Sequence, residues 1–251
     1  MFDLTGRIAV VTGASSGIGV QFAKALAEQG ADLVLLARRK EKLDKVASEI
    51  RDRGRKCLTV KCDVTDTQQI KDAVKATIDE YGKVDILVNN AGAGGEDHIF
   101  ETTDEQWDKE MALNLKGVFV AAREFGKEMK KNNYGRIINI ASMYGLIGSM
   151  TGGIAYHASK GGVVNFTRAL GAELAQYGIT VNAIAPGFFA SEATDHLIDA
   201  EPFKEMVKAT CPMGCSGKEG ELNPALIYLA SDEASYTTGS IVVVDGGLTA
   251  I

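Results

Sequence analysis

The sequence predicts a single doubly wound α/β domain built on a seven-stranded parallel sheet. Short β-branched runs alternate with longer segments of helical periodicity, which is typical of a parallel sheet wrapped by helices. The runs 8–11 and 241–244 are apolar on both faces, as strands covered on both sides require. The 251 residues contain no linker, repeat or low-complexity stretch that would divide them. We therefore expect one domain spanning residues 1–251.

Each predicted strand is a short aliphatic or β-branched run, and each predicted helix is the longer periodic segment that follows it. Strands are expected at Arg7–Thr12, Asp32–Ala37, Lys56–Lys61, Val84–Asn89, Arg136–Ala141, Thr180–Ala185 and Ile241–Asp245. Helices are expected at Gly17–Gln29, Lys40–Arg53, Thr67–Tyr81, Asp104–Lys131, Ala155–Tyr177 and 221–230, with an irregular, partly helical stretch at 188–210. Ligands of such a fold bind outside the carboxyl ends of the strands, where the strand order reverses.

Composition excludes several classes of function. The net charge is −6 and the basic residues are scattered, which argues against a nucleic-acid surface. The N-terminal residues show no signal-peptide pattern, and the apolar runs are too short to span a bilayer. The four cysteines lack metal-ligand spacing, so we expect reduced thiols and no metal site. These observations predict a cytoplasmic protein without a membrane partner.

A glycine-rich segment lies directly between the first predicted strand and the first predicted helix. It reads Thr12-Gly13-Ala14-Ser15-Ser16-Gly17-Ile18-Gly19, with the spacing G-x-x-x-G-x-G. Glycines let the backbone approach a pyrophosphate, and the free N–H groups of a helix N-terminus favour an anion. The segment predicts a dinucleotide site that uses Gly13, Ser15, Ser16, Gly17, Ile18 and Gly19.

The end of the second strand indicates which dinucleotide is bound. A carboxylate here would accept from an adenosine ribose hydroxyl, whereas an arginine accommodates a 2′-phosphate. The sequence offers Ala37-Arg38-Arg39-Lys40, with no carboxylate. The alternative is a solvated basic start to a helix, but cations at a helix N-terminus oppose its dipole. Arg38 and Arg39 therefore favour NADP over NAD.

Two further strand ends offer contacts to the same ligand. Asp63 and Val64 follow the third strand and are placed to hold an adenine, the carboxylate accepting from its exocyclic amine. Asn90, Ala91 and Gly92 follow the fourth strand, where small residues let the backbone pass close to the ribose and nicotinamide. Simple turn chemistry is the alternative explanation for the asparagines.

A tyrosine and a lysine four residues apart predict the chemistry. Tyr156 and Lys160 share one face of a helical segment, one turn from each other. A lysine ammonium at that distance favours a phenolate and should bring the pKa of Tyr156 down towards neutral pH. Ser142 follows the fifth strand, where its hydroxyl can donate to the carbonyl oxygen that Tyr156 protonates.

Taken together and in this order, these motifs resemble the short-chain dehydrogenase/reductases, from Leu4 to Gly247. The resemblance implies that Tyr156 is the general acid/base, that Lys160 lowers its pKa and holds the nicotinamide ribose, and that Ser142 orients the substrate. It implies that Asn114 holds a water joining Lys160 to solvent. It also implies a cofactor-binding part at about 1–140, a catalytic and substrate part at about 141–251, and a homotetramer. The stretch that would meet the nicotinamide carboxamide contains Pro186, Gly187, Phe188 and Ser191.

Departures from the family pattern are few. Ser191 stands where a threonine is usual, which keeps the hydroxyl, and Cys215 and Glu219 replace the usual Arg and Pro of a loop. The loop change puts local geometry in doubt rather than the chemistry.

The substrate is less defined than the reaction. The pattern is similar to gluconate 5-dehydrogenases and 3-oxoacyl-carrier-protein reductases, so a sugar acid or 3-oxoacyl compound is expected. A hydroxysteroid dehydrogenase or a non-catalytic NADP-binding regulator are the alternatives. His157 is expected to be a bystander beside Tyr156. The stretch 188–210 is expected to act as a mobile lid, with Phe188 against the nicotinamide and Phe189 over the substrate.

Overall fold

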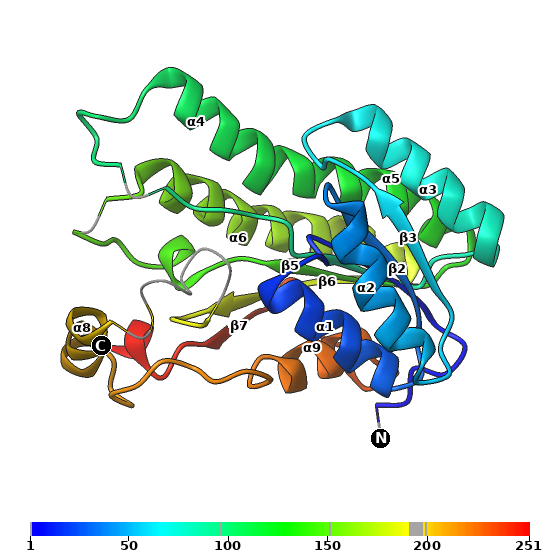
Figure 1. The fold of residues 1–251 in the computed structure, drawn as a ribbon. Coiled ribbons are helices and arrows are strands. Elements are labelled where there is room, and N and C mark those ends of the chain that lie inside the picture. The colour runs from blue at the N-terminus through cyan, green and yellow to red at the C-terminus, as the bar shows by residue number, and fades with distance from the viewer. Residues whose placement is uncertain (1, 96, 151, 191–197, 199) are drawn as a thin grey trace.

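Seven parallel strands form one central sheet in the order β3-β2-β1-β4-β5-β6-β7 (Figure 1), which confirms the predicted fold class. This computed structural model describes residues 2–95, 97–150, 152–190, 198 and 200–251. The strand order reverses between β1 and β4, where Val10 pairs with Val34 on one side and Leu87 on the other. The strands are β1 (Ile8–Thr12), β2 (Asp32–Ala37), β3 (Cys57–Lys61), β4 (Ile86–Asn89), β5 (Gly135–Ile140), β6 (Ile179–Pro186) and β7 (Ile241–Val244).

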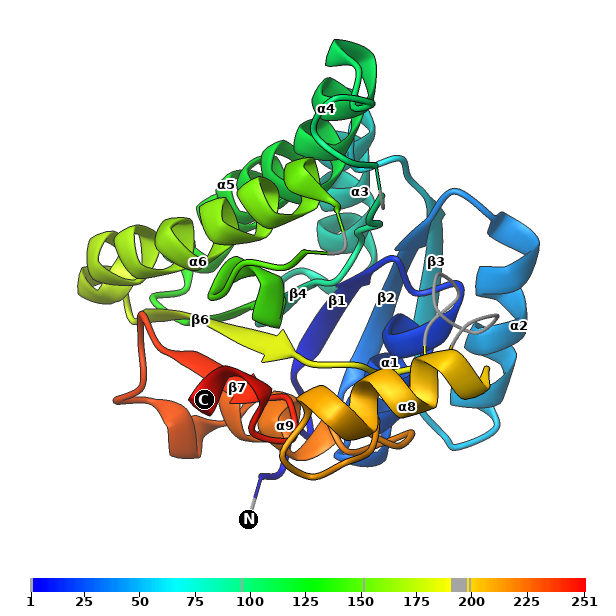
Figure 2. The ribbon, with the colours of Figure 1, turned by 90° about the vertical axis from the view of Figure 1, so that its left-hand side faces the viewer.

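Helices cover both faces of the sheet, which explains why its central strands are apolar on both sides (Figures 1 and 2). On one face α1, α2 and α9 bury residues such as Phe22, Leu43 and Leu226. On the other, α3 and α5 bury Ile70 and Phe125, and α6 packs beside them. The described α-helices are α1 (Gly17–Glu28), α2 (Lys40–Arg51), α3 (Thr67–Tyr81), α4 (Asp104–Met111), α5 (Gly117–Lys131), α6 (Ile154–Leu174), α8 (Glu201–Thr210) and α9 (Asn223–Ala230).

The helix predicted at Asp104–Lys131 differs from the structure in its middle. A π-helical turn at Ala112–Lys116 separates α4 from α5. The widened turn contains Asn114, which is fully buried, and π-turns of this kind are common at functional sites. The helix predicted to run to Tyr177 also ends earlier, because α6 gives way to a 3-10 turn at Ala175–Tyr177 that Gly178 closes with φ +68°.

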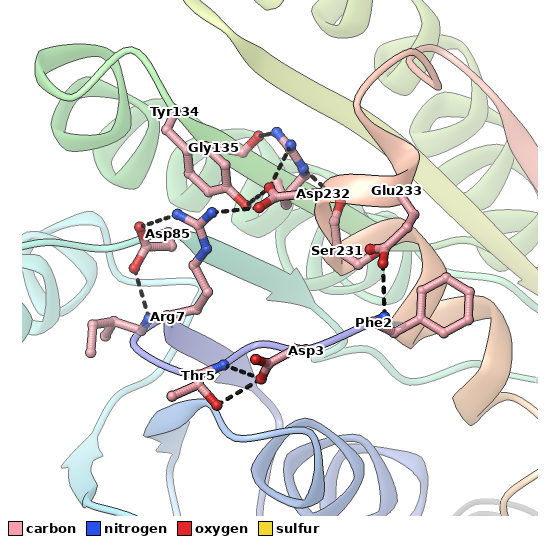
Figure 3. Close-up of polar contacts among 12 residues, drawn as sticks. Phe2, Asp3, Thr5, Arg7, Asp85, Tyr134, Gly135, Ser231, Asp232 and Glu233 are labelled. Atoms are coloured by element: carbon pink, nitrogen blue, oxygen red, sulfur yellow. Dashed lines mark hydrogen bonds and ion pairs between the residues drawn. The ribbon is translucent and has the colours of Figure 1, made fainter.

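A polar network closes the amino-terminal edge of the sheet, opposite the edge where ligands bind (Figure 3). Asp232, just after α9, accepts hydrogen bonds from Arg7 at 2.7 Å and from Tyr134 at 2.8 Å. The guanidinium carbons of Arg7 and Arg136 lie 3.9 and 4.4 Å from the centroid of the Tyr134 ring. Asp85 accepts from the backbone N–H of Ile8 at 2.8 Å. The network thus ties the starts of β1 and β5 to the end of α9.

Within the described ranges, no helix has the combination of length and apolar character needed to cross a bilayer.

Candidate active site

A cavity of about 590 Å³ opens at the carboxyl ends of the strands, where the strand order reverses. The predicted site residues come together here from both halves of the sequence. Those that line it are Gly13, Ser15, Ser16, Gly17, Ile18, Gly19, Arg38, Arg39, Asp63, Val64, Asn90, Ala91, Gly92, Ser142, Tyr156, Lys160, Pro186, Gly187 and Phe188. Asn114 lies buried behind the wall, and Ser191 falls outside the described residues.

The glycines let their loop pack closely against the segment after β4 and against itself. Gly13 has φ +67°, and a Cβ there would lie 2.9 Å from the Cα of Ala91. A Cβ on Gly19 would lie 2.4 Å from the carbonyl oxygen of Gly13. Helix α1 starts at Gly17 with no acidic residue in its first turn and no side-chain cap from Ser16. This arrangement fits a bound pyrophosphate, because the backbone N–H groups of the first turn face an anion without a competing carboxylate.

Two arginines stand at the end of β2 beside this loop. Arg39 donates hydrogen bonds to the hydroxyls of Ser15 at 3.1 Å and Ser16 at 2.9 Å, which fixes its guanidinium against the glycine loop. Arg38 is exposed at the rim of the cavity. The basic pair therefore offers one positioned and one solvent-facing cation, a donor set that fits a phosphate ester.

The segment after β4 is held against β1 by hydrogen bonds. The hydroxyl of Thr12 accepts from the backbone N–H groups of Asn90 and Ala91, both at 2.9 Å. The amide of Asn90 donates to the Thr12 carbonyl at 2.9 Å.

Asp63 lies on another wall of the cavity, after β3. Its carboxylate accepts hydrogen bonds from the N–H of Thr65 at 2.9 Å and from the Thr65 hydroxyl at 2.7 Å. Thr65 thereby orients the carboxylate expected to meet an adenine.

The predicted catalytic side chains lie at the inner end of the cavity. Ser142 follows β5 and makes a hydrogen bond to Tyr156. Close approaches bring the surrounding loops to α6: a Cβ on Gly145 would lie 2.6 Å from the Lys160 carbonyl oxygen, and one on Gly94 would lie 3.2 Å from the Tyr156 ring. Glycine is needed at Gly145 to bring the Ser142 turn against the helix, and at Gly94 it lets the β4 loop approach the Tyr156 ring closely.

The electrostatics of Tyr156 differ from the sequence prediction. Burial raises the pKa of Tyr156 above its usual value of 10.0, and the hydrogen bond from Ser142 offsets this only in part. Lys160 does not provide the expected compensation, because its ammonium donates to the Ile140 carbonyl at 2.8 Å and lies 5.6 Å from the Tyr156 ring centroid. Burial also lowers the pKa of Lys160 to about 8. The pKa of Tyr156 is therefore raised rather than lowered in this structure, and the role of Lys160 in lowering it stays a prediction.

The side chain of Asn114 makes hydrogen bonds to other residues of the protein. Its side-chain oxygen accepts from the N–H of Ala93 at 3.0 Å, and its amide nitrogen donates to the Ala93 carbonyl at 2.8 Å and to Ser159 at 3.2 Å. A Cβ on Gly92 would lie 3.1 Å from the Asn114 oxygen and 3.3 Å from the Lys160 nitrogen, so both groups border the same point. Asn114 thus pins the β4 loop to α6, and the water implied for it stays a prediction.

Buried amides connect the strands that carry these residues. Asn89 in β4 donates to the side chain of Asn139 in β5 at 2.9 Å, and Asn139 donates to the hydroxyl of Thr167 in α6 at 3.0 Å. Thr167 donates in turn to the Val163 carbonyl at 2.7 Å. Asn139 precedes Ile140, whose carbonyl holds Lys160. One hydrogen-bonded chain therefore sets β4, β5 and α6 relative to each other, and the sequence analysis did not identify it.

The outer wall bears on two expectations. Phe189 is buried at 8% exposure, with its ring filling the space that a Cβ on Gly217 would occupy, and it also lines the cavity, so its place over a substrate stays a prediction. His157 lines the cavity with its ring 4.6 Å from that of Tyr144, and its role as a bystander likewise stays a prediction. Residues 191–197 and 199 of the stretch proposed as a lid, 188–210, lie outside the described residues, and the proposed motion stays a prediction.

Comparison with known proteins gives matches along nearly the whole chain. Residues 13–249 match the family model described as enoyl-(acyl carrier protein) reductase. Nodulation protein G from Rhizobium sp. (strain N33) is 42% identical over 252 residues, with 100% of both chains covered. A 3-oxoacyl-(acyl-carrier-protein) reductase from Staphylococcus aureus (strain Mu50) is 37% identical over 243 residues, covering 96% of this chain and 98% of the relative.

A solved structure agrees in fold as well as in sequence. The crystal structure of a gluconate 5-dehydrogenase from Burkholderia cenocepacia J2315, in complex with NADP and tartrate, superimposes with a TM-score of 0.95. Its sequence is 36% identical, and the match covers 100% of this chain and 98% of that one.

Proposed function

Because this chain belongs to the short-chain dehydrogenase/reductase family of oxidoreductases, we propose that it interconverts a ketone and a secondary alcohol using NADP(H). The observation that carries the proposal is the meeting of Ser142, Tyr156 and Lys160 in one cavity with the glycine-rich loop before α1. A protein that only sensed the dinucleotide would not require all three side chains.

The cofactor choice rests on the residues at the end of β2. Ala37 leaves no carboxylate to repel a phosphate, and Arg38 and Arg39 provide two guanidinium groups. The solved gluconate 5-dehydrogenase relative holds NADP, which supports the same assignment here. NADP(H) would lie between the glycine loop, the Asp63–Val64 and Asn90–Gly92 walls, and the Pro186–Phe188 segment, and NADPH would supply a hydride to the carbonyl carbon.

In the proposed mechanism Tyr156 is the proton donor. Its raised pKa keeps the phenol protonated at neutral pH, as a general acid for carbonyl reduction requires. Ser142 hydrogen bonds to Tyr156 and would donate to the same substrate oxygen, which stabilises the negative charge that develops there. Lys160 is held by the Ile140 carbonyl and would set the local positive charge beside the phenol.

The test is NADPH oxidation followed by absorbance with a panel of 3-oxoacyl esters, keto sugar acids and cyclic ketones. Tyr156→Phe should reduce kcat by at least about 10²-fold, since a positioned proton donor contributes about 10²–10⁴-fold. NADPH binding, measured by fluorescence titration, should change little. Alcohol oxidation by the unmodified enzyme should accelerate as pH rises, because the reverse reaction needs the phenolate. A Tyr156→Phe enzyme that kept most of its kcat would refute the assignment.

Three further features are proposals, the first two from the family resemblance and the third from composition. The homotetramer is checked by light scattering coupled to size-exclusion chromatography, and a monomer would contradict it. The division into a cofactor part and a catalytic part near residue 140, and the cytoplasmic location, stay predictions.

A further inference from the structure

The cavity continues past Tyr156 along a strip of aromatic rings. The ring of Tyr144 lies 4.6 Å from that of His157 and meets the ring of Phe188 edge-on at 6.5 Å. Phe188 in turn meets Phe203 of α8 edge-on at 5.3 Å. All four side chains line the cavity, and helix α8 contributes Phe203 to its wall. The strip begins next to the proton donor, since Tyr144 also contacts the Tyr156 ring edge-on at 6.4 Å.

Two methionines complete this apolar wall. Met143, buried behind Tyr144, and Met206, one turn after Phe203 on α8, both line the cavity. Thioether side chains are flexible and polarisable, and they adapt to the shape of an apolar ligand. The part of a substrate next to its carbonyl would therefore meet hydrocarbon and aromatic surface.

Cations are confined to the other parts of the cavity. Among its described lining residues, the lysines and arginines are Arg38, Arg39 and Lys160. Arg39 is held at the glycine loop by Ser15 and Ser16, and Lys160 is held by the Ile140 carbonyl beneath Tyr156.

A histidine and a glutamate lie on or beside this wall. His157 belongs to the strip, and its Nε2 is buried with no hydrogen-bond partner among the described residues. Glu110 of α4 packs under Gly95, a lining residue, where a Cβ would lie 2.5 Å from the Glu110 carboxylate oxygen. Burial raises the pKa of Glu110, against a hydrogen bond from the Gly95 N–H, and the charge of Asp97 raises it further. A carboxylate entering here would lose part of its hydration beside another carboxyl group, with no lysine or arginine among the described residues of this wall to pair with it, which is unfavourable.

From the aromatic strip and the absence of a lysine or arginine among its described residues, we infer that the substrate is an uncharged ketone, or the matching secondary alcohol, on an apolar ring skeleton. The inference rests on the proposed function and narrows it: a sugar acid is disfavoured even though a structural relative is named for one. Burial of ring carbons against Tyr144, Phe188 and Phe203 would supply the binding energy, and Ser142 and Tyr156 would recognise the single polar oxygen.

The test compares a neutral and an anionic derivative of one ring ketone, which differ in charge and in one ethyl group. Ethyl para-oxocyclohexanecarboxylate and its free acid, both with NADPH at pH 7, present the same ring ketone as an ester and as an anion. We expect kcat/KM to be at least about tenfold higher for the ester, which corresponds to about 1.4 kcal/mol. Decalone should likewise be reduced more efficiently than ketogluconate.

Variants at Phe203 test the origin of the preference. Phe203→Lys places an ammonium on the strip and should lower the ester-to-acid ratio by about tenfold. Phe203→Leu keeps the wall apolar and should change the ratio by less than about threefold. Tyr236→Ala removes a fully exposed ring elsewhere and should leave the ratio unchanged. Binding is checked without turnover: in Tyr156→Phe with NADPH, the ester should raise the melting temperature more than the acid does.

The outcomes separate the two claims. An enzyme that reduces the acid or ketogluconate as efficiently as the neutral ketones would overturn this inference and leave the proposed function standing. An enzyme that reduces no ketone of the panel with NADPH would overturn the proposed function and, with it, the substrate class.

Discussion

Lys160 is expected to make folding less favourable at neutral pH, and the size of this effect follows from its burial. Its side chain is 4% exposed, and burial lowers its pKa from 10.5 to about 8. A difference of about 2.5 pH units corresponds to about 3 kcal/mol. Because the folded pKa is below the unfolded one, the penalty is fully present below about pH 8. It is relieved as the pH rises from 8 towards 10.5.

The perturbation is Lys160→Met in a Tyr156→Phe background, which removes the titration of the neighbouring phenol. Methionine keeps most of the apolar stem but cannot be protonated. The lost hydrogen bond to the Ile140 carbonyl costs about 1–3 kcal/mol at every pH and cancels from the pH dependence. The free energy of unfolding of the double variant relative to Tyr156→Phe should therefore fall by about 3 kcal/mol between pH 7 and 10.5.

Urea unfolding at a fixed protein concentration measures this difference, because linear extrapolation gives the free energy at each pH. Lys75→Met is the control: that lysine is largely exposed and pairs with Asp79 at the surface. Its effect should vary little over pH 7 to 9. A Lys160 difference that stayed constant within about 0.5 kcal/mol from pH 7 to 10.5 would refute the reasoning, because it would mean that the buried ammonium is not destabilised.

Three other predictions follow from the described contacts. Arg38→Ala should weaken NADPH binding by about 10- to 100-fold and leave NADH almost unchanged, by isothermal titration; tighter binding of NADH than NADPH by the unmodified protein would contradict it. Thr167→Val leaves the Asn139 amide without its acceptor and should cost about 1–3 kcal/mol in urea unfolding. Thr180→Val removes a buried hydroxyl that has no hydrogen-bond partner among the described residues, and should be neutral or stabilising. If both variants lost the same free energy of unfolding, the Asn139–Thr167 hydrogen bond would not be what stabilises the fold here. Asp232→Asn should cost up to about 1 kcal/mol at neutral pH, because this carboxylate is largely exposed. Burial raises the pKa of Asp232, but hydrogen bonds from Tyr134 and Arg7 outweigh it and lower the pKa, so the difference should vanish as the pH falls below 3.8; a difference that persisted there would exclude this cause.

The sequence was sufficient to predict the sheet and the position of the site. Strands such as β1 are buried at every residue, and this shows in the sequence as an uninterrupted apolar run. The turn after each strand brings its residues to the same edge in a parallel sheet, so Gly13, Asn90, Ser142 and Gly187 could be assigned to one cavity before any coordinates. Local pattern and global topology agree at these positions.

The features that the sequence did not predict are those set by three-dimensional contacts between particular side chains. Periodicity cannot distinguish a π-turn at Asn114 from a continuing α-helix, because both keep the same residues buried. The spacing of Tyr156 and Lys160 predicts that they share a face, yet the ammonium turns to the Ile140 carbonyl. Phe188 and Phe189 are adjacent and chemically identical. Phe189 is buried because its ring packs where Gly217 has no side chain, and the sequence does not show that contact.

The placement of the catalytic residues depends on contacts well below the cavity. Ser142 follows β5, Asn90 follows β4, and Tyr156 and Lys160 belong to α6, so their relative geometry is that of three separate elements. The Asn89–Asn139–Thr167 chain connects those three elements, and Asn114 pins the β4 loop to α6 through Ala93 and Ser159. Buried amides are costly unless every donor and acceptor is matched, so a shift of one element would leave several groups unsatisfied at once. Displacing any one of the three elements therefore costs free energy. This keeps the buried Tyr156 aligned with Ser142.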